Sequence, residues 1–378
     1  MQSFSVLPAE PQRTWLRLLI WALALVLPGC GGGSSGNQIN LPPPTPQFIA
    51  IDASGAGFTT FLGTTAQDIN ANADIAGFYT DPNNTSHGLL RTSAGTLIVF
   101  DAPGAGTANS QGTDSRGINA SATIVGSFLD QNFVSHGYTR TSGGSFTTLD
   151  APGSYATLAL AINDGGVVTG EFLDPNQFAH GFVRANDGTF ITFDAPGSMG
   201  ATFQGTIPSR INASGSVVGF FTDSNFVLHG FVRTANGTIL TLDAPGAGVQ
   251  AATGTQATDI NDSGVVVGVL YDSGIAHSFV RDVHGAYTVF DPPQSGSQGS
   301  SATGINASGA IAGIYTDANS VMHGYVRNTD GSFVTIDDPG ATQTANSLGT
   351  NISHINATGA VVGVYFDSFR AKHGFARE

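Results

Sequence analysis

Residues 211–243 read INASGSVVGFFTDSNFVLHGFVRTANGTILTLD, and this stretch decides the fold. It contains Ile-Asn, a glycine seven residues after that asparagine, an Asp-x-Asn segment, a His-Gly-Phe-Val-Arg segment and an alternating segment that ends at Asp243. Clusters of Gly, Asn, Ser and Thr separate the apolar segments, as is typical of short strands joined by turns. The stretch therefore predicts four short strands, the first of which ends at Ile211-Asn212.

The same pattern occurs seven times along the chain. Its asparagines are 44 to 50 residues apart, which is the length of one four-stranded propeller blade. The second strand of each copy is continuously apolar, as in a strand covered on both faces, whereas the fourth alternates. The asparagine and glycine of the copies are Asn70/Gly77, Asn119/Gly126, Asn163/Gly170, Asn212/Gly219, Asn261/Gly268, Asn306/Gly313 and Asn356/Gly363.

The two ends of the repeat region are complementary. Residues 48–53 match only the fourth strand of a copy, and the printed sequence stops after the third strand of the last copy. Together they make one whole unit, and a closed ring would use both parts because closure removes exposed sheet edges. We therefore expect an all-β, seven-bladed β-propeller over residues 47–378, whose N-terminal strand completes the last blade. An open right-handed β-solenoid is the alternative.

Each copy also carries an aspartate, a histidine and an arginine in fixed order. We expect the aspartate and histidine to hydrogen-bond across the hairpin between strands two and three, as a structural network rather than a catalytic one, because a single axial site needs different groups from different copies. The pairs are Asp81/His87, Asp130/His136, Asp174/His180, Asp223/His229, Asp272/His277, Asp317/His323 and Asp367/His373. A further aspartate, as in Asp243-Ala-Pro-Gly, is expected to hold a turn.

The first 46 residues differ from the rest. Two arginines precede ten apolar residues, 18–27, which is too short for a membrane span and typical of a secretory signal. Leu27-Pro28-Gly29-Cys30 resembles a bacterial lipobox, so residues 1–29 are expected to be a signal peptide and Cys30 the lipidated residue. An ordinary secretory signal is the alternative. Residues 30–46 are rich in Gly, Ser and Pro and are expected to form a tether.

Composition excludes several classes of protein. The chain has 13 Lys and Arg against 27 Asp and Glu, a net charge of −14, and one cysteine. So few cations argue against nucleic-acid binding, and a single cysteine argues against a disulfide framework or thiolate zinc. Five hairpins read Asp-x-Asn, part of a calcium-loop pattern, but no bidentate acid follows, so we interpret them as turns. We therefore predict no metal and no cofactor.

Catalytic motifs for a serine, cysteine or phosphate-binding site are missing from the sequence. The remaining candidates are carboxylates. Glu171 is the one glutamate between residues 47 and 377, and Asp68, Asp114 and Asp259 precede Ile-Asn segments or lie near them. If these residues face a central channel, two acids could serve glycoside cleavage or lyase chemistry there.

Long connections between strands two and three, and between copies, are expected on one face. Variable loops on a rigid scaffold are the usual place for binding, and aromatic side chains among polar ones suit sugar rings or a protein partner. The alternative is that these rings pack locally over the hairpins. The candidate ligand residues on this face are Phe133, Phe178, Phe226, Phe369, Arg116, Arg210 and Tyr155, with His354 in a longer link.

The Ile-Asn-x-x-Gly-x-x-x-Gly segment followed by His-Gly-Phe or His-Gly-Tyr resembles the bacterial extracellular HAF repeat over residues 48–378. The resemblance implies an exported repeat protein of β-structure and no particular activity. We therefore expect a monomeric lipoprotein of the bacterial cell envelope, at the outer membrane or cell surface, touching the membrane through its lipid. Its expected function is non-enzymatic binding or scaffolding of a polysaccharide or protein. A polysaccharide hydrolase or lyase and a purely structural envelope protein are the alternatives.

Overall fold

A computed structural model describes residues 47–198 and 204–378, and the regular elements within these ranges are all β-strands. The expected signal peptide at 1–29, Cys30 and the tether at 30–46 lie outside the described residues. None of the described residues belongs to a helix that is long and apolar enough to cross a membrane. The expected all-β class is confirmed.

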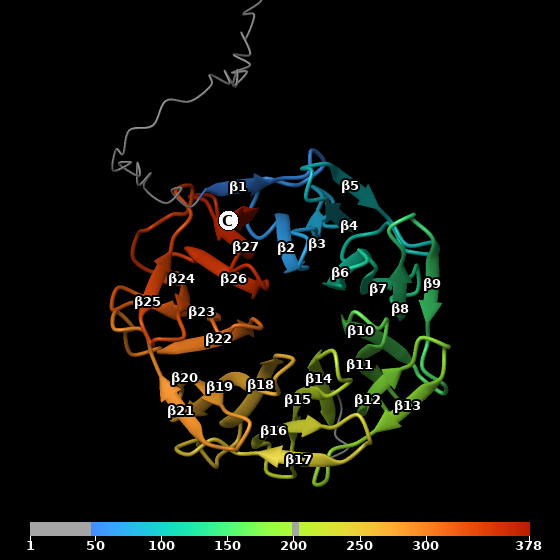
Figure 1. The fold of residues 1–378 in the computed structure, drawn as a ribbon. Helices are drawn as coiled ribbons and strands as arrows, with labels where there is room; N and C mark the ends of the chain where they lie inside the picture. The colour runs from blue at the N-terminus through green and yellow to red at the C-terminus, as the bar shows by residue number, and fades with distance from the viewer. Residues whose placement is uncertain (1–46, 199–203) are drawn as a thin grey trace, which may run out of the picture. The chain divides into compact units, whose positions relative to one another are not determined.

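Each repeat folds into consecutive antiparallel strands, arranged around a common centre (Figure 1). The first strand of each repeat lies nearest the centre and ends at the repeated Ile, immediately before the repeated Asn. The first strands are β2 (Gly63–Ile69), β6 (Gly112–Ile118), β10 (Ala156–Ile162), β14 (Thr206–Ile211), β18 (Gly254–Ile260), β22 (Ser300–Ile305) and β26 (Thr350–Ile355). The second strands are β3 (Ile75–Thr80), β7 (Ile124–Leu129), β11 (Val168–Leu173), β15 (Val217–Thr222), β19 (Val266–Asp272), β23 (Ile311–Thr316) and β27 (Val361–Phe366).

The third strands contain the repeated histidine, which is followed by glycine except in β20, where Ser278 follows. The fourth strands lie at the periphery (Figure 1). The third strands are β4 (Ser86–Arg91), β8 (Ser135–Arg140), β12 (Ala179–Arg184), β16 (Leu228–Arg233), β20 (Ile275–Arg281), β24 (Met322–Arg327) and β28 (Lys372–Arg377). The peripheral strands are β1 (Phe48–Ile51), β5 (Leu97–Phe100), β9 (Phe146–Leu149), β13 (Phe190–Phe193), β17 (Ile239–Leu242), β21 (Tyr287–Phe290) and β25 (Phe333–Ile336).

The hydrophobic core lies between neighbouring sheets rather than in one central mass. Val218 of β15, Leu242 of β17 and Phe279 of β20, for example, are buried in one cluster built from two successive repeats. The second strands are buried on both faces, whereas the peripheral strands are partly exposed, as the apolar patterns predict. Each sheet therefore depends on its neighbour for the burial of its apolar face, which the hydrophobic effect rewards.

The first and last strands of the described chain lie side by side. β1 pairs antiparallel with β28, from Phe48 opposite Arg377 to Ile51 opposite Gly374. The backbone amides and carbonyls of Gln47 and Glu378 continue this pairing, with N···O distances of 3.3 and 3.2 Å. The segment 48–51 therefore supplies the peripheral strand beside the last repeat.

The repeated asparagines link each repeat to the next. The side-chain amide of each donates to the backbone carbonyl oxygen of the asparagine one repeat later, at 2.9 to 3.3 Å, and Asn356 donates to Asn70 at 3.1 Å. The same side chains accept backbone amides of their own turns, such as that of Ala360 on Asn356. Each asparagine therefore holds a turn and joins two sheets.

Replacing Asn356 with alanine is expected to lower the free energy of unfolding by about 2 kcal/mol, because buried backbone groups of both joined repeats lose partners. Urea unfolding measures the change. Asn236→Ala is the matched control, since Asn236 accepts the amide of Thr238 in an exposed turn without a bond to another repeat. Equal losses for the two variants would contradict the role given to the asparagine link.

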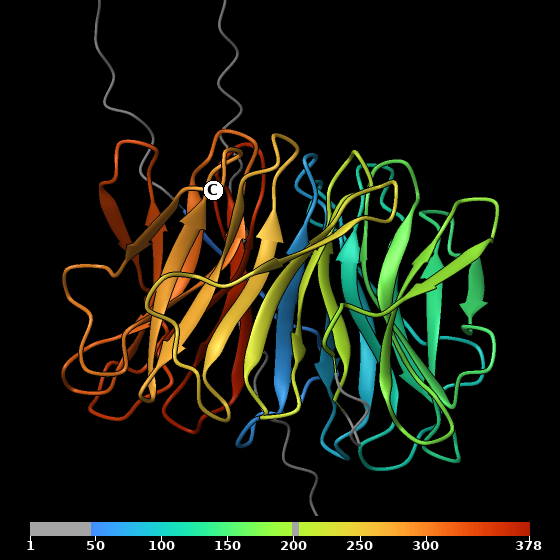
Figure 2. The same ribbon diagram turned by 90° about the horizontal axis from the view of Figure 1, so that it is seen from below.

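The strands run between two loop-bearing faces (Figure 2). One, the tight-turn face, carries the short turns that follow the first and third strands, such as 212–216 and 234–238. The other, the long-loop face, carries the links between repeats, such as 243–253, and the hairpins between second and third strands, such as 223–227. The prediction of long connections on this face is wrong for the hairpins, which are as short as the turns of the tight-turn face, because the aspartate at their start accepts backbone amides of the same turn. The chain enters β1 from the tight-turn face.

Candidate functional site

One position of the first strands differs from repeat to repeat in its chemistry. In every first strand the pairing with the second strand shifts by one residue immediately before this position. Such bulges turn side chains away from the regular pleat. The residues at this position are Asp68, Gly117, Ala161, Arg210, Asp259, Gly304 and His354. Because the fold is the same in all copies, these differences are not required by the fold.

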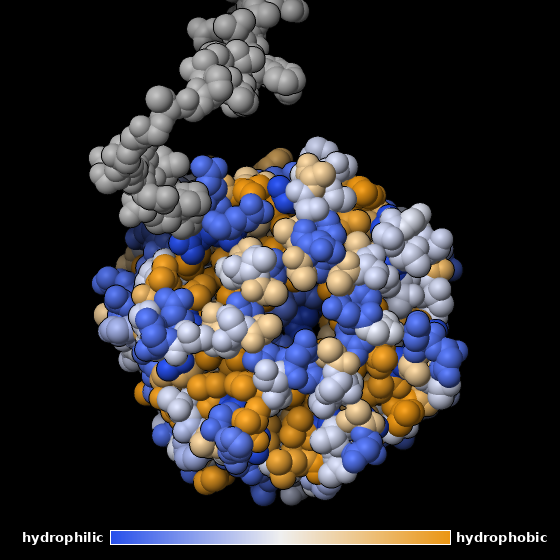
Figure 3. Space-filling view, viewed as in Figure 1, coloured by the Kyte–Doolittle hydropathy of each residue, from blue (hydrophilic) through white to orange (hydrophobic). Residues whose placement is uncertain are grey.

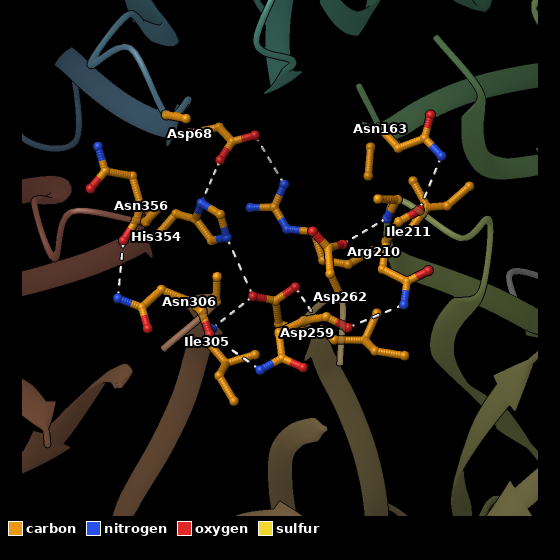
Figure 4. A pocket seen from close by; sticks show the side chains of 18 of the residues that line it. Asp68, Asn163, Arg210, Ile211, Asp259, Asp262, Ile305, Asn306, His354 and Asn356 are labelled. Atoms are coloured by element: carbon orange, nitrogen blue, oxygen red, sulfur yellow. Dashed lines mark hydrogen bonds and ion pairs between the residues drawn. The ribbon is translucent and has the colours of Figure 1, made fainter. Parts of the chain in front are cut away.

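The four charged members of this set meet at the centre of the molecule (Figure 4). Arg210 Nη1 donates to Asp68 Oδ2 at 3.1 Å. His354 Nδ1 lies 2.6 Å from Asp68 Oδ1, and its Nε2 lies 3.3 Å from Oδ2 of Asp259. The side chains are 6 to 17% exposed. Four residues that lie as much as 286 positions apart in sequence thus form one chain of ion pairs, which we call the axial cluster.

Backbone amides fix the two carboxylates of the axial cluster. Asp68 accepts the amide of the next residue, Ile69, at 3.0 Å and that of Ile118 in the next repeat at 3.1 Å. Asp259 accepts the equivalent amides of Ile260 and Ile305, both at 2.8 Å. The carboxylates are therefore held as rigidly as the strands that carry them.

The charges of the axial cluster stabilise one another. Burial opposes the charge on Asp68, but Arg210 and His354 outweigh it and lower the pKa of Asp68 to about 2. Burial and Arg210 oppose the charge on His354, but Asp68 and Asp259 outweigh both and raise its pKa to about 9. The pKa of Arg210 is raised by Asp68 and Asp259 against the effect of burial. At neutral pH Asp68 is therefore an anion, and His354 and Arg210 are cations.

A cavity of about 220 Å³ opens beside the axial cluster. The ends of the first strands and the repeated asparagines line it, together with Asp164 and Asp262, which are exposed. Hydrophilic residues surround a hollow at the centre of the face in Figure 3. Within residues 47–198 and 204–378, no group of three or more His, Cys, Asp or Glu side chains is arranged to hold a metal ion.

The channel carboxylates predicted from the sequence separate into two groups. Asp68 and Asp259 lie together at the axis, joined through His354. Asp114 instead lines a second pocket of about 270 Å³, where its Oδ2 lies 3.5 Å from Arg116 Nη2. Glu171 lies on β11, and burial, opposed by Arg116, raises its pKa to about 7.

Three arginine and histidine positions on the predicted ligand face are corrected. Arg116, Arg210 and His354 were expected in loops, yet they lie within β6, β14 and β26, and the last two belong near the tight-turn face. The first strands begin earlier than the apolar pattern indicates, because charged side chains occupy inward positions. The sequence signal is the spacing, since Asp68, Arg210, Asp259 and His354 each stand two residues before a repeated asparagine.

The expected hydrogen bond between hairpin aspartate and histidine is also corrected. In six repeats the hairpin aspartate oxygen lies 3.6 to 4.0 Å from His Nε2, and the carboxylate instead accepts backbone amides of its own turn. The histidine Nδ1 hydrogen-bonds the aspartate at the end of the peripheral strand, at 2.6 to 3.1 Å. These pairs are His87–Asp101, His136–Asp150, His180–Asp194, His229–Asp243, His277–Asp291, His323–Asp337 and His373–Asp52.

The aromatic candidates do lie on the long-loop face. Phe133, Tyr155, Phe226 and Phe369 are 50 to 72% exposed, whereas Phe178 is half-buried. Phe133 and Phe226 occupy the same hairpin position in their repeats, with φ of 61° and 63°. Other repeats place Asn84, Gln177, Ser320 and Arg370 at this position. Sequence analysis did not single out two further exposed rings on this face, Phe58 and Phe61.

Comparison with known proteins supports the fold alone. No protein-family model matches the chain, and no curated protein matches it. Among solved structures, a prolyl endopeptidase has a TM-score of 0.56 at 11% identity, over 82% of this chain and 47% of that one, so the match spans about half of the endopeptidase. The BP39L lectin from Burkholderia pseudomallei has a TM-score of 0.50 at 9% identity, over 84% and 96% of the two chains. The chain is thus an all-β protein of four-stranded sheets, similar in fold to these two structures.

Proposed function

We propose that the chain is an exported, lipid-anchored, seven-bladed β-propeller that binds carbohydrate outside the cytoplasm without chemical turnover. The ring is supported by the asparagine bonds, which pass through all seven repeats and return from Asn356 to Asn70. It is supported again by the pairing of β1 with β28. Export and lipidation at Cys30 rest on the sequence of residues 1–30 and on the resemblance to HAF repeats.

The strained, exposed phenylalanines of the long-loop face carry the proposed binding function. Phe61, Phe133 and Phe226 all have φ between 61° and 65° and are 50 to 55% exposed. A positive φ costs a non-glycine residue roughly 1–2 kcal/mol, and an exposed ring gains little from burial. Both features lower stability, and backbone strain of this kind concentrates at functional sites. Phe61 also packs edge-on against Phe366, with ring centroids 6.4 Å apart. Exposed aromatic rings of this kind are suited to stack on sugar rings.

The position of the chain's entry point agrees with this choice of face. Gln47, the first described residue, pairs with Glu378 at the tight-turn face. The point at which the expected tether joins the described chain therefore lies on the face opposite the long-loop face. The fold similarity to a lectin is consistent with a carbohydrate ligand.

The axial carboxylates suit binding better than hydrolysis. A glycoside hydrolase needs one carboxyl group that keeps its proton and a second that is ionised. Asp68, with a pKa of about 2, stays ionised, and Asp259 is committed to two amides and His354. Glu171, with a pKa of about 7, is the acid on which the alternative, a polysaccharide hydrolase or lyase, would depend. Turnover of a polysaccharide that Glu171→Gln abolishes would support that alternative.

Affinity gel electrophoresis of the purified protein in gels containing xylan, alginate, dextran or pectin tests the binding function. We expect at least one polysaccharide to retard the protein, and Phe133→Ala to weaken the interaction about tenfold, because a single ring contact of this kind is worth about 1 kcal/mol or more. Ile191→Ala is the control, since Ile191 is 49% exposed on the peripheral strand β13. Retardation by none of the polysaccharides, with capture of a protein partner instead, would replace carbohydrate by protein as the ligand. Absence of any ligand would favour a structural role.

A further inference from the structure

We propose that the axial cavity is a second ligand site, which takes one neutral sugar ring, such as the end of a glycan chain, through Arg210 and Asp259. The inference rests on the proposed function for the class of ligand and adds a site near the tight-turn face. The cavity of about 220 Å³ is lined by all four residues of the axial cluster. It is smaller than the roughly 300–1,000 Å³ of pockets for drug-sized ligands, which suits a single ring.

Folding alone does not explain the charges around this cavity. Buried ion pairs add little net stability compared with apolar side chains of similar volume, because the charges lose their hydration. Three repeats have a small residue at this position of the first strand, namely Gly117, Ala161 and Gly304. A Cβ added to Gly304 would lie 2.8 Å from His354 Cδ2, so that glycine leaves room for the imidazole. The repeats thus combine small and charged residues so that charged groups from four repeats reach one another at the cavity.

Hydrogen-bond donors and acceptors of the axial cluster remain for a ligand after the contacts within the cluster are made. Arg210 has five N–H donors, and among the described residues one of them is used, toward Asp68. Asp259 accepts two amides and one contact from His354, whereas a carboxylate offers about four acceptor positions. Arg210 can therefore donate to a ligand oxygen, and Asp259 can accept from a ligand hydroxyl.

Charge balance selects the class of ligand. Within the axial cluster Asp68 and Asp259 face Arg210 and His354, and Asp164 and Asp262 add two carboxylates to the lining of the cavity. An anion would therefore be repelled by several carboxylates, and a cation that reaches the axial cluster would be repelled by Arg210 and His354. A neutral polyol supplies donors and acceptors without either repulsion. The exposed Asp164 and Asp262 add further acceptors for hydroxyl groups.

The test uses free glucose, galactose, mannose, fucose, rhamnose and N-acetylglucosamine at millimolar concentration with the full protein. Saturation-transfer NMR detects binding, and ¹³C-labelled histidines report its place. We expect at least one sugar to shift the ring resonance of His354 saturably and to leave His284, in an exposed turn, unchanged. No transfer from any of the six sugars, or transfer without a shift at His354, would overturn the proposal.

Substitutions provide the second measurement. Asp259→Asn and Arg210→Gln are expected to weaken sugar binding about tenfold or more. The controls are Asp187→Asn, in an exposed turn, and Arg184→Gln, at the end of β12, which should leave binding unchanged. Thermal unfolding identifies variants that fail to fold. If a variant fails to fold, the shift of the His354 resonance in the unaltered protein decides whether the axial cavity binds sugar. Retardation by polysaccharide without a His354 shift would overturn the axial site and leave the proposed function standing. Absence of binding to both polysaccharides and free sugars would overturn both.

Discussion

Gly268→Ala is expected to lower the free energy of unfolding by about 3 kcal/mol, a large effect for one methyl group. Gly268 lies on β19, opposite Ala257 of β18. A Cβ at this position would collide with the backbone oxygen of Gln256 and lie 2.8 Å from the buried ring of Phe279. The Gln256 oxygen cannot move away without separating β18 from β19, and the ring of Phe279 on β20 is fully buried. Urea unfolding with a constant m-value measures the loss.

Gly143→Ala is the matched control for this prediction. Gly143 lies in an exposed turn, and a Cβ there would find its nearest atom, Thr141 Oγ1, 3.9 Å away. Its stability should change by less than about 0.5 kcal/mol, as for most surface substitutions. If Gly268→Ala were equally mild, the close approach of strand and ring would be contradicted. The glycine at this position of each second strand would then need another explanation.

Stability is expected to fall as the pH rises from about 6.5 to 9, because of His354. Its pKa in the folded protein, about 9, lies above the ordinary value of 6.5. The protonated form is therefore favoured by folding, and this contribution is complete below pH 6.5 and lost as the pH passes through 9. The pKa difference corresponds to about 3 kcal/mol. Urea unfolding at a series of pH values measures the slope.

Asp68 produces the opposite dependence at acid pH. Its folded pKa of about 2 lies below the ordinary 3.8, so its contribution is present above about pH 4 and is lost as the pH falls toward 2. Burial raises the pKa of Glu171 to about 7, so folding favours its protonated form, and this contribution is lost between about pH 4.5 and 7. Stability should therefore be greatest near about pH 4, and the slope between about pH 7 and 9 is the part that His354 determines. His354→Gln should flatten the alkaline limb, whereas His284→Gln, in an exposed turn, should leave it unchanged. An alkaline limb of equal slope in His354→Gln would contradict the ion-paired axial cluster.

The strand order was predictable because it depends on local patterns that seven copies repeat. The first strands end at the Ile-Asn segments, the third strands begin near the repeated histidine, and Gly and Asn mark the turns between strands. The partner of each repeated histidine was not predictable in this way. His229 lies six residues from Asp223 and fourteen from Asp243, and the shorter separation suggested the pair. The register of β16 with β17 decides for Asp243, while Asp223 is occupied with its own turn.

The axial cluster was predicted only in part. Asp68 and Asp259 are among the four carboxylates that the sequence offers for a channel site, but the sequence pattern places Arg210 and His354 in loops on the long-loop face. A charged residue inside a strand breaks the apolar pattern by which strands are recognised. The bulge before Arg210 and His354 turns these side chains toward the axis, and a bulge follows from pairing with β15 and β27 rather than from the residues themselves.

The most direct test of the central claim measures stability and polysaccharide binding together in Phe226→Asn. Asparagine tolerates a positive φ and occupies the equivalent position as Asn84. We predict a higher thermal midpoint than that of the unaltered protein, because asparagine adopts the positive φ of Phe226 at a lower cost in free energy. We also predict polysaccharide binding at least about tenfold weaker, because the variant lacks the exposed ring. Asn84→Phe should conversely lower the midpoint. A variant Phe226→Asn that loses stability, or that binds as tightly as the unaltered protein, would contradict the assignment of the long-loop face as the carbohydrate site.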